Sequence, residues 1–75
     1  MKKKNIELIW YDKNDEIISC DETNKVLNEN YVEVKTVVQN CVDDAIILGC
    51  TENEIKNKLS ELISQTYFSL GKKTN

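Results

Sequence analysis

Apolar residues recur along the middle of the chain at alternating steps of four and three. The series is Leu27, Tyr31, Val34, Val38, Cys41, Ala45 and Leu48. Steps of this size keep side chains on one face of an α-helix, so the pattern predicts a single long helix. We expect this helix to begin within Asp21–Asn24 and to run without a break to Leu48. Its candidate N-cap residues are Asp21, Thr23 and Asn24.

A second, shorter helix is predicted after the first. Gly49 stands where a residue with positive φ would end the first helix. Thr51 and Glu54 then have the spacing of a capping box, in which each side chain satisfies a backbone amide of the other residue. The two helices should therefore be antiparallel, and the second should end before Gly71. Its apolar positions are Ile55, Leu59, Leu62, Ile63 and Phe68.

The N-terminal part of the chain has a different pattern. Residues 5–12 and 16–20 are rich in β-favouring side chains and predict two short strands. A two-residue loop at Asn14-Asp15, with Asn14 at positive φ, would pair Tyr11 with Ile18 and Ile9 with Cys20. Both faces of such a hairpin are apolar, and only one of them can pack on the helices of the same chain.

Together these elements predict an α+β fold in one small domain, residues 1–75. A β-hairpin precedes a long helix and a shorter antiparallel helix, and residues 1–4 and 72–75 form basic tails. The apolar arc of the long helix spans about 200°, more than one neighbouring helix can cover. A chain this short often needs oligomerisation for stability, so we expect a homodimer. The predicted interface residues are Trp10, Val34, Val37, Val38 and Ile46.

Charge is distributed unevenly. Residues 5–71 contain five lysines and thirteen acidic residues, a net charge of −8, although the whole chain carries −3. An acidic body argues against direct nucleic-acid binding and suits a basic protein partner. The alternative function is therefore an acidic inhibitor, of the immunity, antitoxin or anti-defence type, that covers a nucleic-acid-binding protein. Its recognition face would comprise Glu29, Glu33, Asp43, Asp44, Glu52 and Glu54.

Residues that usually carry catalysis or bind metals are scarce. The chain has no histidine, arginine or proline, and its three cysteines form no Cys-x-x-Cys pair. Cys50, close to a predicted helix N-terminus, has the one favourable context for a reactive thiol. We therefore expect no catalytic, cofactor or metal site. With no membrane-spanning or signal segment, the sequence indicates a cytoplasmic, non-enzymatic protein–protein interaction module.

A helix-turn-helix regulator is a second alternative. Ala45, Gly49 and Ile55 have the spacing at which that motif holds two helices at an angle. Asp44 and Lys58 occupy positions that are normally apolar in the motif. Glu52 and Glu54 would also face the phosphates of DNA, which makes this alternative the weaker one.

Overall fold

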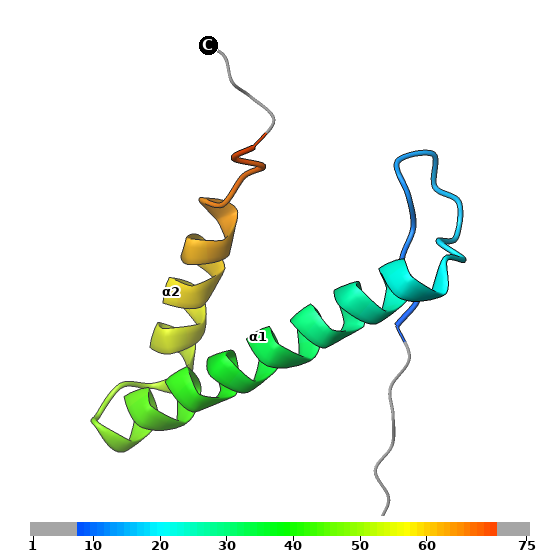
Figure 1. Cartoon of the computed structure of the whole chain (residues 1–75). Coiled ribbons are helices and arrows are strands. Elements are labelled where there is room, and N and C mark those ends of the chain that lie inside the picture. The colour runs from blue at the N-terminus through cyan, green and yellow to red at the C-terminus, as the bar shows by residue number, and fades with distance from the viewer. Residues whose placement is uncertain (1–7, 71–75) are drawn as a thin grey trace, which may run out of the picture. The chain divides into compact units, whose positions relative to one another are not determined.

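The computed structural model describes residues 8–70, which contain two helices, α1 (Asp21–Ile47) and α2 (Glu52–Ser64). A tight turn joins them, so the predicted helical hairpin is confirmed (Figure 1). The predicted α+β class is wrong, because residues 8–70 contain no β-strand. The predicted basic tails, residues 1–4 and 72–75, lie outside the described part of the chain, as do residues 5–7 of the first predicted strand.

The N-terminal segment approaches a hairpin but pairs at a single point. Tyr11 and Ile17 form an isolated antiparallel bridge, and the Ile18 amide donates to the Trp10 carbonyl at 2.9 Å. The second predicted strand cannot extend to Cys20, because the Cys20 carbonyl already accepts a helical hydrogen bond from the Asn24 amide. The start of α1 thus shortens the ladder, and two strands alone are marginally stable.

The loop of this segment has three residues, 13–15, rather than two. The Asp15 amide donates to the Asp12 carbonyl at 2.9 Å, and Asp15, not Asn14, has the positive φ, 64°. Asp12 Oδ1 also accepts from two amides, of Asn14 and Glu16, at 2.8 and 2.9 Å. A turn followed by a left-handed residue is the usual form of a three-residue hairpin loop.

The loop length changes which side chains share a face. The predicted pairs Tyr11–Ile18 and Ile9–Cys20 are wrong, because Tyr11 lies opposite Ile17 instead. A shift of one residue moves every side chain of a strand to the other face. Trp10 and Ile18 are therefore on the same face, where both are half-buried, whereas Tyr11 and Ile17 are exposed.

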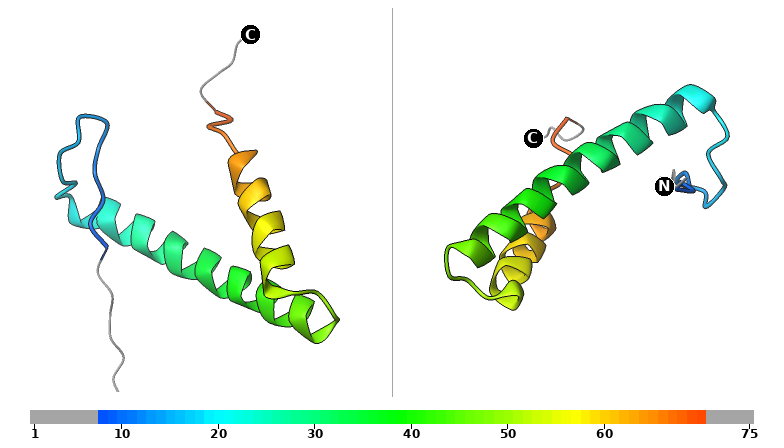
Figure 2. Two further views of the ribbon diagram at one scale, coloured as in Figure 1. Left: turned by 180° about the vertical axis from the view of Figure 1, so that it is seen from behind. Right: turned by 90° about the horizontal axis from the view of Figure 1, so that it is seen from below.

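Helix α1 is unbroken through Asn28–Asn30, as predicted, and both views of Figure 2 show it as one continuous coil. Its first helical residue, Asp21, lies in the predicted range, and its last, Ile47, is one residue short of the predicted end. All three candidate N-caps were wrong, because Asp21, Thr23 and Asn24 lie inside the helix. The Asn24 amide group instead donates to the Ile18 carbonyl at 2.9 Å.

The turn between the helices matches its prediction closely. Gly49 has φ 116°, its amide donates to the Ile46 carbonyl, and the Cys50 amide donates to the Ala45 carbonyl at 2.8 Å. This pair of bonds is the Schellman arrangement, which satisfies the last carbonyls of a helix. Thr51 is the N-cap of α2, with its hydroxyl accepting from the Glu54 amide at 3.0 Å. The Glu54 carboxylate contacts Lys58 instead of completing the capping box.

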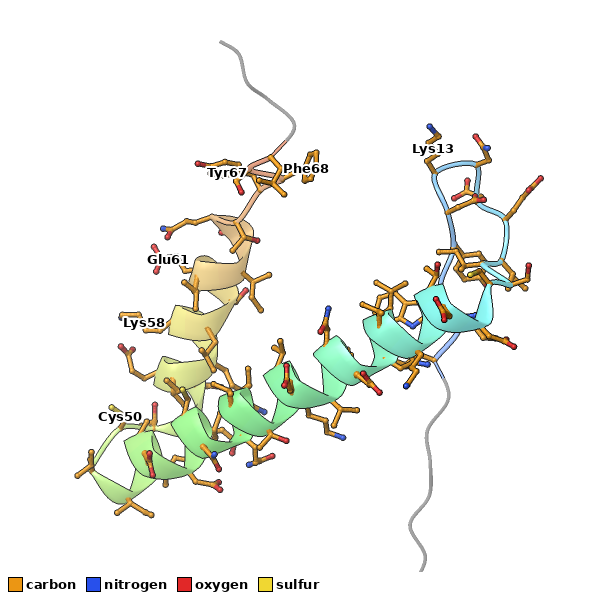
Figure 3. All side chains as sticks on the ribbon, viewed as in Figure 1. Lys13, Cys50, Lys58, Glu61, Tyr67 and Phe68 are labelled. Atoms are coloured by element: carbon orange, nitrogen blue, oxygen red, sulfur yellow. The ribbon has the colours of Figure 1, made fainter. Side chains whose placement is uncertain are left out.

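Helix α2 ends at Ser64, several residues before Gly71. Phe68 was predicted to line this helix, but it lies beyond its end, beside Tyr67 (Figure 3). The hydroxyls of Ser64 and Thr66 donate to the carbonyls of Glu61 and Ile63, both at 2.8 Å. Short polar side chains that bond to nearby carbonyls compete with helical hydrogen bonding, which explains the early end.

Packing falls into two compact units, divided within α1 between Thr36 and Val37. In the first unit the half-buried side chains come from the N-terminal segment and the start of α1: Leu8, Trp10, Ile18, Asn24, Leu27 and Asn28. In the second unit they come from the end of α1 and the first two turns of α2: Val38, Val42, Ala45, Ile55 and Leu59. Each unit therefore has a small cluster of half-buried side chains and, within residues 8–70, no fully buried core.

Candidate interaction surface

Apolar side chains remain accessible along the whole described chain. No residue between 8 and 70 is buried, and sixteen large hydrophobic side chains are exposed. Soluble monomers rarely leave large contiguous apolar surfaces open to water, so such surfaces indicate contact sites. On α1 these exposed side chains are Val26, Tyr31, Val32, Val34, Val37, Ile46 and Ile47.

The five predicted interface residues divide into two groups. Val34 and Val37 are about equally accessible, at 58% and 60% of their surface, and Ile46 is 44% exposed. Trp10 and Val38 are half-buried within their own chain. Sequence patterning alone could not separate the groups, because all five lie at apolar positions, and the separation depends on which neighbour covers each one.

Trp10 is the best-anchored of the five. Its indole Nε1–H donates to Asn28 Oδ1 at 2.7 Å, and its ring meets Tyr31 edge to face with centroids 6.4 Å apart. Aromatic pairs favour this geometry, and a buried indole normally finds an acceptor. Trp10 therefore attaches the N-terminal segment to α1 and is less available to a partner than the sequence suggested.

The middle of α1 has little cover from its own chain, although Tyr31 meets the Trp10 ring. Nine consecutive residues, 29–37, are all exposed, on every side of the helix. The stretch mixes polar residues such as Glu29 and Glu33 with the apolar Val34 and Val37, and Val37 lies one turn after Glu33 on the same side of the helix. A helix normally keeps its apolar stripe against a neighbour, so this stretch has an unfilled contact face.

The six predicted recognition carboxylates are all exposed, but three of them form ion pairs with a lysine four residues away. Glu29 lies 3.9 Å from Lys25, and the pairs Glu52–Lys56 and Glu54–Lys58 are closer, at 2.7 and 2.6 Å. Asp43 Oδ1 accepts from Gln39 Nε2 at 3.1 Å. Within residues 8–70, Glu33 and Asp44 form no ion pair.

The ion pairs on α2 also shift the pKa values of Glu52 and Lys58. A hydrogen bond from Lys56 and its positive charge lower the pKa of Glu52. A hydrogen bond to Glu54 and its negative charge raise the pKa of Lys58. Both are exposed i, i+4 pairs, which stabilise a helix only modestly and are screened by salt.

All three cysteines are free and exposed, and Cys20 also has a favourable context for a reactive thiol. The Thr23 hydroxyl, followed by the amides of Thr23 and Glu22, lowers the pKa of the Cys20 thiol. Cys20 precedes the first residue of α1, so its sulfur occupies the place of an N-cap side chain. Sequence reasoning missed it because serine, threonine, aspartate and asparagine are the usual caps. The available clue was the Cys-x-x-Thr spacing.

Residues 8–70 hold no group of three or more histidine, cysteine or acidic side chains that could bind a metal ion. A hollow of about 390 Å³ beside the start of α1 is lined by Leu8, Asp21, Asn24, Lys25 and Asn28. In that stretch of chain, neither helix has the length and apolar character needed to cross a membrane.

Comparison with known proteins adds no further constraint on this surface. No protein-family model matches the chain, and neither a curated protein nor a solved structure shows detectable similarity to it.

Proposed function

We propose that the chain is a non-enzymatic protein–protein interaction module that forms a homodimer through the apolar face of α1. One observation carries the proposal: residues 8–70 bury no side chain while sixteen large hydrophobic residues stay exposed. Val34, Val37 and Ile46 are the accessible members of the contact face.

A chain of 75 residues gains little stability from its own core, and small proteins commonly gain more by oligomerisation. A second copy is present wherever the first is, and a two-fold contact uses the same apolar face twice. Two such helical hairpins form a four-helix arrangement, in which facing helices cover each other's apolar side chains.

Sedimentation velocity over a micromolar concentration series tests the proposal. The expected result is a species of twice the 8.7 kDa chain mass that dissociates on dilution. Val37→Asp should shift the equilibrium to monomer, because it places a charge in the contact, whereas Glu61→Lys, at an exposed position on α2, should not. A clean monomer of the parent chain at every concentration would overturn the proposal.

A second candidate function is inhibition of a basic, nucleic-acid-binding protein by the acidic face. The body charge of −8 supports it, together with the exposed carboxylates of Glu33 and Asp44. Complementary charge mainly accelerates association and makes binding sensitive to salt. Affinity capture from the native host at low and high salt tests this function. A basic protein retained only at low salt supports it, and equal retention at both salts, or no captured protein, counts against it.

A further inference from the structure

We draw no further inference here: the strongest candidate, the exposed apolar surface patch at the C-terminal end of α2 (Leu62, Ile63, Tyr67, Phe68 and Leu70), carries none, because nothing within residues 8–70 shows what covers it.

Discussion

The two ends of α1 are held by different kinds of contact. At the N-terminal end, one aromatic side chain makes a directional attachment, with the Trp10 indole bonded to Asn28 and packed edge to face on Tyr31. At the C-terminal end, the half-buried side chains are all aliphatic, and the directional bonds belong to the turn backbone around Gly49. The first end therefore depends on one residue, whereas the second depends on several weak contacts and on backbone conformation.

Trp10→Ala should give the largest change. It removes the ring and the donor together, and we expect a loss of about 2 kcal/mol, below the value for a fully buried tryptophan because this one is half-buried. Trp10→Phe keeps a ring and removes the Nε1–H, so it should cost about 1 kcal/mol. Urea melts followed by circular dichroism measure both. Equal effects of the two changes would show that the hydrogen bond, not the ring, attaches the segment.

Two leucines on α2 form a matched pair for the other end. Leu59 is half-buried and Leu62 is 56% exposed, although both lie on the same helix. We expect Leu59→Ala to cost about 1.5 kcal/mol and Leu62→Ala less than half of that, because less apolar surface leaves water at position 62. The melts should be recorded under dilute, monomeric conditions. A larger loss at position 62 would mean that α2 packs through a different face.

Gly49→Ala should cost about 1 kcal/mol. The φ of 116° is one that alanine rarely adopts, and a Cβ built there meets no atom within 4 Å, so the cost is conformational rather than steric crowding. Thr51→Ala should cost a similar amount, about 0.5–2 kcal/mol, by removing the acceptor for the Glu54 amide. Thermal melts of each variant test this. A Gly49→Ala melt equal to that of the parent would argue for a helix continuing through residue 49.

The smallest expected effect is on ionisation at the N-terminal end. Thr23→Ala should raise the pKa of Cys20 towards its usual value, because the Thr23 hydroxyl is the largest cause of the lowered pKa. The reaction rate of a Cys20-only variant with a maleimide, measured against pH, reports the thiolate fraction. With Thr23→Ala the profile should move to higher pH, while Glu22→Gln, which keeps its backbone amide, should leave it nearly in place. An unchanged Thr23→Ala profile would contradict the assignment.

The sequence predicted best those features that depend on the conformational preference of a single residue and on its nearest bonds. The Gly49 turn and the Thr51 cap were predicted correctly because each depends on the conformational preference of one residue and on bonds a few residues away. The hairpin register was wrong because it depends on whether the Asp12 carboxylate caps a two- or a three-residue loop. Two loop lengths were compatible with the same residues, and only the observed bonds distinguish them.

The candidate interface shows the same limit. The sequence identified Val34, Val37 and Val38 as apolar helix positions, and all three lie on α1. It could not show that Val38 is half-buried in its own chain while Val34 and Val37 are exposed, since covering depends on where α2 contacts α1. Cys20 was missed because a thiol seldom caps a helix.

The nine exposed residues in the middle of α1 have a consequence for hydrogen exchange. Isolated helices usually lose protection from their ends, where hydrogen bonds are incomplete. In α1 no residue between Asn28 and Val38 is half-buried, and after Tyr31, which meets the Trp10 ring, the stretch has no recorded tertiary contact within residues 8–70. In the monomer the amides near Val34 should therefore open independently of the rest and exchange faster than those near Asn28 or Val42. This helix should melt from its centre, and its least protected amides should be the ones that gain most protection when a second copy binds.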